Sequence, residues 1–519
     1  MSLIGSQEIY DLDPKMDLLK ALTQSRVSRR ILRSLVKKCQ SCGNTRLNVG
    51  LELIARIRQH GCRSCRLAAS IIRRVILGGS SAFGADPEFV IKGLSDSIFR
   101  RSLSSVISGL ARFGARTPFV PGAPFQVVWN VTRACNLKCK HCYEIAGTRN
   151  YDEMSTQDAL SCIERLSDAG IVFLAFSGGE PSLRPDILSL IRQAAEKGIY
   201  VAMATNGTTL SRAGTIKKFK EAGLKFVQIS LDGASEATHD DFRGVAGAFR
   251  KTVQAIKNCV AEGVFVEVAM TVTRHNLAEL FDTVQLCRSL GVRWFMVYNF
   301  VPVGRGTAIL ESDLTPNERE KMLHDILDMI RAKSSSEDMD ILTTAPQLGR
   351  VARMASGEMC ESSCQSSVDL YPTHFFNARL PVQMRELSKF IGGCGAGRFY
   401  LTVEPNGDIY PCVFFPHIPK VRVGNILRDD FQKLWNENRV LNDLRNKDLL
   451  KGACSTCESR FVCGGCRARA IQYFDDYHAP DPVCIKNVTF WKALKAQEKV
   501  HERFRAAIQK ATPKASQRG

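Results

Sequence analysis

One short stretch of this chain, Trp129 to Tyr143, carries residues of the right type and spacing for metal chemistry; it reads WNVTRACNLKCKHCY. Cys135, Cys139 and Cys142 follow the spacing C-x3-C-x2-C, directly after the apolar run Phe125 to Val131, which predicts a strand. Such closely spaced thiolates suit metal binding better than disulfides. Three cysteines can ligate three irons of a cubane iron–sulfur cluster and leave the fourth iron open. An open site predicts a catalytic centre, although a three-cysteine zinc knuckle or chance clustering gives the same pattern.

The bulk composition favours a globular, metal-binding protein. The chain has 519 residues, 45% of them hydrophobic and 24% charged, so about two to four domains are expected. The first residues, MSLIGSQEIYDLDPK, lack the basic start and apolar core of a signal peptide. The sequence contains no run of about 18 apolar residues, so no membrane span is expected. In a cytoplasmic protein, 19 cysteines are expected to bind metal rather than to form disulfides.

Positive charge is concentrated near the N-terminus. The formal net charge is +19, and residues 1–120 contain 20 Lys and Arg against eight Asp and Glu. This bias favours an acidic partner, such as nucleic acid, an anionic membrane surface or a carboxylate-rich substrate. A solvated basic face is the alternative.

Four cysteines in this basic region form two knuckles. Cys39 and Cys42 make one C-x2-C pair, Cys62 and Cys65 make another, and 19 residues separate the pairs. The spacing predicts a tetrahedral four-cysteine site, most often for zinc and sometimes for a single iron. A metal there would hold together a module without a large core of its own. Free thiols remain the alternative.

The rest of the N-terminal region reads as helices. Apolar residues recur at helical spacing in Leu47 to Gln59, and Gly61 is a plausible C-cap. Arg66 to Leu77 and Ile98 to Phe113 are basic and amphipathic, which favours packing on their own domain, with contact to a membrane surface as the alternative. Gly114 to Pro124 is rich in Gly and Pro and predicts a linker.

Strands and helices alternate from residue 125 to about residue 335, which predicts parallel strand–helix units. The expected strands are Phe125–Val131, Ile171–Ser177, Tyr200–Thr205, Phe226–Leu231, Val264–Val272 and Trp294–Tyr298. The expected helices are Ser155–Ala169, Pro185–Lys197, Arg212–Ala222, Ala248–Glu262, Leu277–Leu290 and Thr315–Lys333. In barrels of parallel strands, chemistry lies at the C-terminal ends of the strands.

Motifs do follow these strands at the expected end. The three-cysteine motif follows the first strand, and Gly178-Gly179-Glu180 follows the second. The two motifs, placed at successive strand ends, resemble the signature of the radical S-adenosylmethionine (SAM) superfamily. The resemblance covers the middle region and implies a partial (β/α)6 barrel.

The resemblance also implies how SAM is bound and cleaved. In relatives the free iron chelates the amino and carboxylate groups of SAM, and an electron from the cluster cleaves SAM to a 5′-deoxyadenosyl radical. The candidate SAM-binding residues here are Gly178, Gly179, Glu180, Ser230, Asp232 and Arg243. The Gly-Gly-Glu motif would receive the amino group through its backbone and carboxylate. Ser230, with Asp232 beside it, is a candidate for the ribose and Arg243 for the SAM carboxylate; each could also be a plain turn residue.

Seven of the cysteines in the C-terminal region follow one another in an informative order: Cys394, Cys412, Cys454, Cys457, Cys463, Cys466 and Cys484. Their order resembles the SPASM extension of radical SAM enzymes, which holds one or two auxiliary 4Fe–4S clusters. By this resemblance one cluster would be ligated by Cys454, Cys457, Cys463 and Cys484. A second, if present, would be ligated by Cys394, Cys412 and Cys466, with Cys360, Cys364, an exogenous group or nothing as fourth ligand.

Two further features of this region bear on the resemblance. The two-residue spacing between Cys463 and Cys466 departs from the usual three and is similar to that of relatives that modify haem precursors. Leu401–Pro405 and Asp408–Val413 predict a hairpin, as expected for this extension. Zinc ribbons throughout the region are the alternative.

The expected architecture is therefore α/β: a partial (β/α)6 TIM-like barrel with a basic helical N-terminal extension and a small cysteine-rich α+β C-terminal iron–sulfur domain. The expected boundaries are residues 1–120 for the helical region with the four-cysteine knuckle and 121–335 for the barrel. The auxiliary-cluster domain is expected at residues 336–490, and a basic C-terminal helix and tail at 491–519.

The expected function is reductive cleavage of SAM at a 4Fe–4S cluster, to start the radical modification of a tetrapyrrole precursor or of a ribosomally made peptide. A low-potential electron donor of the flavodoxin or ferredoxin type is implied. A lipid-like substrate at an anionic membrane surface, with peripheral membrane contact, is one alternative. A non-catalytic iron–sulfur or zinc scaffold that binds nucleic acid through residues 1–120 is another. The Gly-Gly-Glu motif argues against the scaffold, which needs no SAM amine site, so a nucleic-acid partner is not expected.

Overall fold

The computed structural model describes residues 25–82, 86–150, 152–332, 339–357 and 392–496. Cys360 and Cys364, considered above as cluster ligands, and most of the C-terminal tail lie outside these ranges. The described residues divide into two compact units, one up to residue 123 and the other from residue 124 onward.

The N-terminal unit is helical. Its described helices are α2 (Arg26–Leu35), α3 (Arg46–Ile54), α4 (Arg63–Ala82), α5 (Pro87–Gly93) and α6 (Ser97–Phe113). Their core contains Leu35, Leu47, Leu51, Ala68, Ile72, Ile76, Leu94 and Ile107. Helices α3 and α4 pack closely because Gly50 has no side chain; a Cβ there would lie 2.6 Å from the Ile72 side chain. The expected helical character of the region is confirmed.

The predicted extent of the helix at Leu47–Gln59 is wrong. Helix α3 ends at Ile54, because Arg56 adopts a left-handed conformation with φ of 59°. The backbone N–H groups of Ile57 and Arg58 then turn back to the carbonyl of Glu52. Gly61 is not the cap. Because α3 ends at Ile54, the chain is free to turn toward the start of α4 at Arg63.

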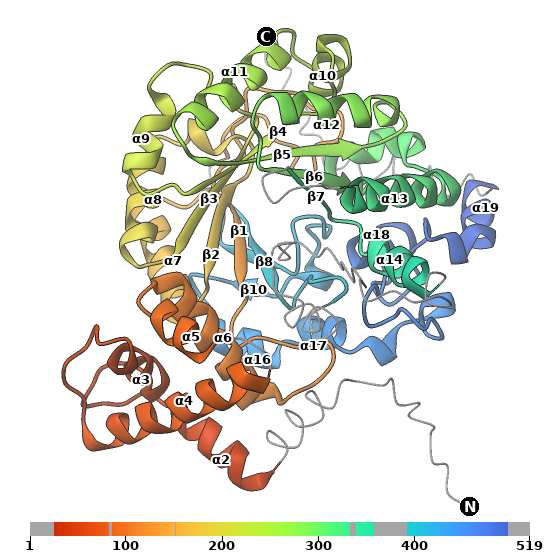
Figure 1. Cartoon of the computed structure of the whole chain (residues 1–519). Coiled ribbons are helices and arrows are strands. Elements are labelled where there is room, and N and C mark those ends of the chain that lie inside the picture. Colours follow the sequence, from red (N-terminus) through yellow and green to blue (C-terminus); the bar gives the residue numbers. More distant parts are fainter. Residues whose placement is uncertain (1–24, 83–85, 151, 333–338, 358–391, 497–519) are drawn as a thin grey trace, which may run out of the picture. The chain divides into compact units, whose positions relative to one another are not determined.

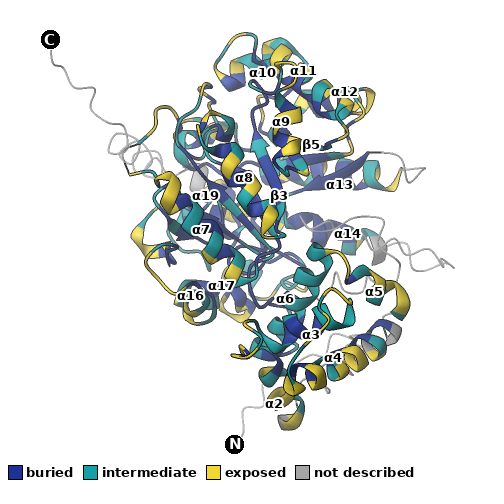
Figure 2. Ribbon diagram, turned by 90° about the vertical axis from the view of Figure 1, so that its left-hand side faces the viewer, coloured by how far each residue is buried: buried dark blue, intermediate teal, exposed yellow. Residues whose placement is uncertain are grey.

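The larger unit contains one sheet in the order β10-β9-β8-β1-β2-β3-β4-β5-β6-β7. Six of its strands are those expected: β1 (Gln126–Asn130), β2 (Phe173–Ser177), β3 (Tyr200–Thr205), β4 (Phe226–Ser230), β5 (Phe265–Val272) and β6 (Trp294–Asn299). Neighbouring strands among them pair in parallel. Figure 2 shows the strands of the sheet as largely buried. The predicted partial barrel is confirmed.

Helices of the larger unit flank the sheet, as Figure 1 shows. The expected ones are α7 (Thr156–Ala169), α8 (Ile187–Glu196), α9 (Thr215–Glu221), α11 (Ala248–Ala261), α12 (Leu280–Ser289) and α13 (Pro316–Arg331). Local signals begin and end them: Thr315 and Glu318 form a complete capping box at α13, and Gly170 ends α7 in a left-handed conformation. Helix α10 (Glu236–Arg243) was not expected; it follows β4 and carries Arg243.

The C-terminal region joins the same sheet. Strand β8 (Tyr400–Val403) pairs in parallel with β1, and β9 (Asp408–Tyr410) returns antiparallel to β8, so the predicted hairpin is confirmed. Strand β10 (Gly424–Asn425) pairs with β9, and β7 (Asp340–Thr343) pairs in parallel with β6. The main helices beyond β7 are α14 (Gln347–Gly357), α16 (Phe431–Glu437), α17 (Arg439–Arg445), α18 (Arg467–Phe474) and α19 (Val488–Ala496). Among the helices described, none has the length and apolar character needed to cross a bilayer.

Candidate functional site

The inner face of the barrel lines an open cavity of about 1300 Å³. Alternate residues of the strands point into it, for example Gln126 and Val128 of β1 and Gln228 and Ser230 of β4. Short side chains on three strands leave the space free: Ala175, Ala202 and Ala269. Polar motifs at the carboxyl ends of the strands also line it, among them Ser177, Thr205 and Ser230.

The three-cysteine loop lies at this end of the barrel, and Cys135, Cys139 and Cys142 all line the cavity. Two backbone hydrogen bonds tie the loop to the end of α10: Lys138 N–H donates to the Arg243 carbonyl (3.1 Å) and Lys140 N–H to the Phe242 carbonyl (2.9 Å). The sulfurs of Cys135, Cys139 and Cys142 do not converge on a single point. Among the described residues, they do not belong to any group of three or more ligand atoms that lie within 4.8 Å of one another. The spacing suits a cluster, in which each thiolate binds a different iron.

The environment of these thiols fits an anionic metal–thiolate group. Burial raises the pKa of the Cys135 thiol to about 11 and also raises that of Cys142, so a metal must displace protons when it binds. Two cations compensate the charge that this creates. Arg243 donates to the Cys139 sulfur at 3.6 Å, and Arg305 donates through Nε to the Cys139 carbonyl at 3.0 Å.

Arg243 is held at the cavity by a buried carboxylate. Its Nη2 lies 2.6 Å from Asp232 Oδ2, and both side chains are at least nine-tenths buried. Although burial opposes the charged form, Asp232 and Cys139 raise the pKa of Arg243. Arg243 and Ser230 line the cavity, whereas Asp232 does not. Asp232 therefore acts on the site by positioning Arg243.

His141 shields the same corner. Its ring lies over that of Phe242, with 4.2 Å between centroids, and it lines the cavity. Burial, with Arg243 and Arg305 nearby, holds the pKa of His141 well below its usual range, so the ring is neutral. A neutral aromatic side chain beside the cysteine loop limits the access of water.

The two glycines allow the end of β2 to lie against the cysteine loop. A Cβ at Gly178, where φ is +127°, would lie 2.4 Å from the Thr132 carbonyl oxygen, and one at Gly179 would lie 2.3 Å from that of Ala134. Gly179 N–H donates to the Thr132 carbonyl at 2.7 Å. Both glycines line the cavity. Any side chain here would push the two loops apart.

Glu180 is not among the residues that line the cavity. The side chain is fully buried and accepts hydrogen bonds from Thr205 Oγ1 (2.8 Å), the Asn206 backbone N–H (2.8 Å) and Ser182. Burial raises its pKa, which these hydrogen bonds oppose. Asn206 in turn donates to Asn136 of the cysteine loop at 2.9 Å. The observed role of Glu180 is thus to fix the turn after β3, which contacts that loop.

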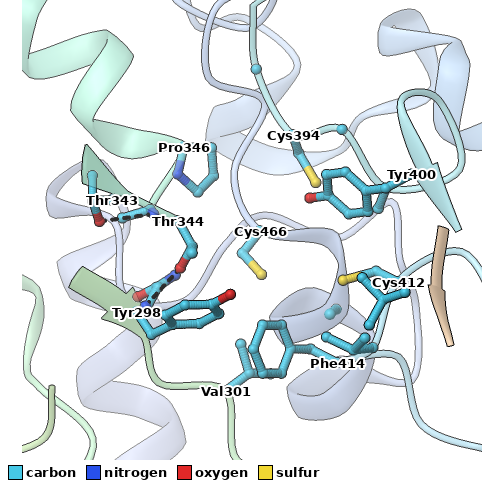
Figure 3. A pocket seen from close by; sticks show the side chains of 18 of the residues that line it. Tyr298, Val301, Thr343, Thr344, Pro346, Cys394, Tyr400, Cys412, Phe414 and Cys466 are labelled. Carbon is cyan, nitrogen blue, oxygen red and sulfur yellow. Dashed lines mark hydrogen bonds between the residues drawn. The ribbon is translucent and has the colours of Figure 1, made fainter. Parts of the chain in front are cut away.

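A second cavity, of about 1000 Å³, adjoins the first. Cys394, Cys412 and Cys466 line it, and their sulfurs face the same space with Tyr298 on the opposite side (Figure 3). Seven residues line both cavities: Gln126, Val128, Tyr298, Asn299, Val301, Val413 and Phe414. Phe414 packs against Tyr298 and against Tyr143, with ring centroids 6.0 and 5.5 Å apart. An aromatic wall therefore separates the two groups of cysteines.

A third and smaller cavity, of about 360 Å³, is lined by Cys454, Cys457, Cys463 and Cys484. Cys463 and Cys466 thus face different cavities although only two residues lie between them. Gly464 and Gly465 make this possible, with φ of 65° and 64°. The structure groups the seven cysteines as the sequence resemblance grouped them.

Matches to family models cover the three-cysteine loop and the C-terminal cysteines up to Cys457. The model of the radical SAM superfamily matches residues 129–300, and that of the iron-sulfur cluster-binding SPASM domain matches residues 394–458. The AdoMet-dependent heme synthase of Methanosarcina barkeri (AdoMet is SAM) is 34% identical over 367 residues, which are 70% of this chain and 97% of that protein. The chain belongs to the radical SAM superfamily.

Two further similarities extend this result. The mycofactocin maturase MftC of Mycobacterium ulcerans is 30% identical over 367 residues, covering 70% of this chain and 88% of the maturase. The crystal structure of Streptococcus suis SuiB bound to its precursor peptide SuiA superposes with a TM-score of 0.58 at 17% identity, over 84% of this chain and 92% of SuiB, and so shares the fold.

Membership of the superfamily confirms that the protein is a radical SAM enzyme that uses SAM and 4Fe–4S clusters. The alternative of a non-catalytic scaffold is wrong. Neither family model reaches the four-cysteine region of the N-terminal unit.

Several residues of this radical SAM site escaped the sequence reasoning. Asn130 donates to both Glu144 (2.8 Å) and Glu404 (3.0 Å), two buried carboxylates beside the cysteine loop, and His417 lies 3.3 Å from Glu404. Burial, with Glu144 nearby, raises the pKa of Glu404. These residues are far apart in the sequence. Among them, Asn130 alone carried a sequence signal for the site, because it is a polar residue at the end of a predicted strand. Tyr298, at the end of β6, had the same signal.

Proposed function

We propose that this enzyme modifies a carboxylate-bearing tetrapyrrole, and that Cys135, Cys139 and Cys142 hold the cluster at which SAM is cleaved. The similarity to a heme synthase over nearly the whole length of that relative carries the proposal. The two-residue spacing between Cys463 and Cys466 also favours this substrate class. When bound, the reduced cluster supplies the electron that cleaves SAM and begins hydrogen-atom abstraction.

The chain's own residues would orient SAM from three sides. Gly178 and Gly179 line the cavity with no side chain in the way, so their main-chain carbonyls would accept hydrogen bonds from its amino group. Arg243 supplies a cation for its carboxylate, and Asp232 holds that cation in place. Ser230, at the end of β4, offers a hydroxyl for the ribose. Glu180 contributes through the turn after β3 rather than by direct contact.

The two remaining cysteine groups are proposed to hold auxiliary clusters. Cys454, Cys457, Cys463 and Cys484 offer a full set of four thiolates to one cluster. Cys394, Cys412 and Cys466 offer three to another in the second cavity, which shares a wall with the first. An auxiliary cluster there would lie next to the substrate space and could accept the electron left on an oxidised product.

The lining of the adjoining cavities supports a largely apolar substrate with a flat ring system. The wall between them presents aromatic and aliphatic side chains: Tyr298, Val301, Val413 and Phe414. Such a surface favours stacking with a macrocycle. A peptide is the second candidate, because a mycofactocin maturase is 30% identical and covers a similar share of the chain.

The decisive experiment measures 5′-deoxyadenosine and substrate mass in anaerobically reconstituted enzyme with SAM and a low-potential reductant. Tetrapyrroles with propionate side chains are expected to stimulate 5′-deoxyadenosine formation and to lose mass from those side chains. Pools of unmodified precursor peptides are the matched comparison. Stimulation by a peptide alone would replace the tetrapyrrole proposal with the peptide one, and absence of SAM cleavage with iron bound would contradict the cluster assignment.

We further propose that electrons come from an acidic carrier of the flavodoxin or ferredoxin type. The formal net charge of +19 gives the electrostatic complementarity that speeds association with such a carrier. Reduction of the clusters by flavodoxin is expected to slow as the salt concentration rises. A rate that does not change with salt would contradict a charge-guided encounter.

Peripheral contact with an anionic membrane surface is also proposed for the N-terminal unit. Large apolar side chains are exposed there: Val27, Ile31, Ile57, Leu67, Val75 and Phe89. In helix α4, Leu67 and Val75 lie among Arg63, Arg66, Arg73 and Arg74, and Figure 2 shows many exposed residues along this helix. The protein is expected to co-sediment with phosphatidylserine vesicles but not with phosphatidylcholine vesicles. Failure to co-sediment with either kind of vesicle would contradict the proposal.

A further inference from the structure

We infer that Cys39, Cys42, Cys62 and Cys65 bind one zinc ion, which holds the N-terminal helical unit together and takes no part in the radical chemistry. The four sulfurs all lie within 4.8 Å of one another. The sulfurs of Cys39 and Cys62, which come from different knuckles, are 3.6 Å apart. Four thiolates at about 2.3 Å from a tetrahedral zinc lie roughly 3.8 Å from each other, so the site has the size of a single ion.

The first pair is built into a tight turn. Gly43 N–H donates to the Cys39 carbonyl at 2.9 Å, Cys39 N–H donates to the Asn44 carbonyl at 2.8 Å, and Gly43 has a φ of 78°. An isolated bridge between Lys38 and Thr45 closes the turn. This geometry directs Cys39 and Cys42 to the same point.

The second pair lies at the start of α4. Cys62 directly precedes the helix and Cys65 is its third residue. Cys62 N–H also donates to the Cys42 sulfur, 3.5 Å away, so the two pairs are already hydrogen-bonded to one another. Four thiolates around a divalent ion carry a net charge of −2, and the positive end of a 20-residue helix stabilises negative charge.

The compactness of the site excludes a cubane. In a cubane each thiolate binds a separate iron, which spreads the sulfurs further apart than around one ion. None of the other described cysteine groups brings three sulfurs within 4.8 Å of one another. The N-terminal site is therefore of a different kind from the three groups proposed to hold clusters.

Zinc is the ion that best suits a closed site of four thiolates. A tetrahedral sulfur site selects zinc or iron, and divalent zinc binds such ligands more tightly than ferrous iron does. With all four positions taken by the protein, no site is open for substrate, which is typical of structural zinc.

The ion would complete a small core. Cys39 and Cys65 are buried against Val49 of α3, with Leu53 packed beside them. The zinc would thus clamp the turn at Cys39 and the start of α4 onto α3, whose early end at Ile54 allows the chain to return. Binding of a metal then contributes directly to the folding of this unit.

The first experiment measures the metals of the full-length protein, purified without oxygen and with its clusters loaded. About one zinc per chain is expected, and zinc X-ray absorption should show four sulfurs at about 2.3 Å. Iron at this site in the protein as isolated, seen as a high-spin mononuclear ferric signal after oxidation, would overturn the zinc assignment. Zinc-free protein with four titratable thiols in the unit would overturn the metal site altogether.

The second experiment tests the role. Cys42→Ser is expected to lose the zinc, to keep its full iron content and SAM cleavage, and to add a thermal transition below that of the wild type. Cys259→Ala, a buried cysteine of α11 outside every metal group, is the matched control and should keep its zinc. Loss of iron or of SAM cleavage in Cys42→Ser would overturn the separation of the site from the radical chemistry. If the variant does not fold, the absorption spectrum of the wild type still decides the ligand set.

Discussion

Two segments of this enzyme share the spacing C-x2-C and use it in opposite ways. At Cys39 and Cys42 the turn directs both sulfurs to one point, whereas Cys463 and Cys466 line separate cavities. The difference lies in the residues between and after the pairs. A hydrogen-bonded turn closes the first pair, and two glycines with positive φ reverse the chain between the second. Spacing alone therefore predicts that cysteines bind metal. The backbone conformation decides whether the two cysteines of a pair face the same metal site or two different ones.

The largest expected effect separates the cluster cysteines from the compact site. Cys139→Ala should lower 5′-deoxyadenosine formation more than about 100-fold, because losing even a supporting partner of a metal site costs about 10- to 100-fold. Iron should fall by about four per chain while zinc is unchanged. Anaerobic activity assays and elemental analysis check both. Zinc falling together with iron would mean that the two kinds of site are not independent.

The next prediction tests the divided pair. Cys463→Ala and Cys466→Ala should each lose about four irons per chain, but from different clusters. The clusters that remain should then give different electron paramagnetic resonance spectra in the two variants. Cys463→Ala would remove the cluster of the third cavity, and Cys466→Ala would remove the cluster of the second. Identical spectra would show that both cysteines serve one cluster, as Cys39 and Cys42 serve one ion.

Two ion pairs of the larger unit differ sharply in burial. Asp232→Asn leaves Arg243 buried without its ion pair, which is expected to cost about 3–5 kcal/mol in the free energy of unfolding of the larger unit. Asp241→Asn is the matched control: its pair with Lys140 is about half exposed, and the loss should be about 0–1 kcal/mol. Chemical denaturation followed by fluorescence measures both. Equal losses would show that burial does not set the strength of these pairs.

The smallest effect concerns pH. Burial raises the pKa of Glu267, next to the cavity residue Gln228, from 4.5 to about 7. The folded state therefore holds this proton more tightly than the unfolded state, and stability falls by about 3 kcal/mol as pH rises from about 4.5 through about 7. Glu267→Gln should remove this loss, and the exposed Glu437→Gln should not.

Much of the barrel could be predicted from the sequence because its signals are local. Six strands are marked by short buried runs, and caps such as Thr315 fix the helix starts. Helix α10 was missed because its sequence, EATHDDFR, is polar, and what keeps it in place is the buried pair of Arg243 with Asp232. The end of α3 was missed for a similar reason, since only tertiary structure shows why the chain must turn at Arg56.

The site was predictable in its motifs and less so in the direction of its side chains. The sequence pointed to Gly178, Gly179, Ser230 and Arg243, and all four line the cavity. Glu180 and Asp232 are fully buried, and each holds a neighbour: Glu180 accepts from the Asn206 N–H, and Asp232 pairs with Arg243. A motif specifies residue types, whereas the register of the strands and the hydrogen bonds behind them decide which atoms reach the cavity.

The pairing of β8 with β1 has a consequence for how the two cysteine regions could have been acquired. Gln126 to Trp129 lie in register with Tyr400 to Val403, so the first strand of the barrel has its outer edge covered by the C-terminal region. A barrel that stopped at residue 335 would expose that edge as a template for joining another chain. Solubility alone would then favour inheriting the two regions as one gene segment, and a shortened enzyme is expected to aggregate before its chemistry can be assayed.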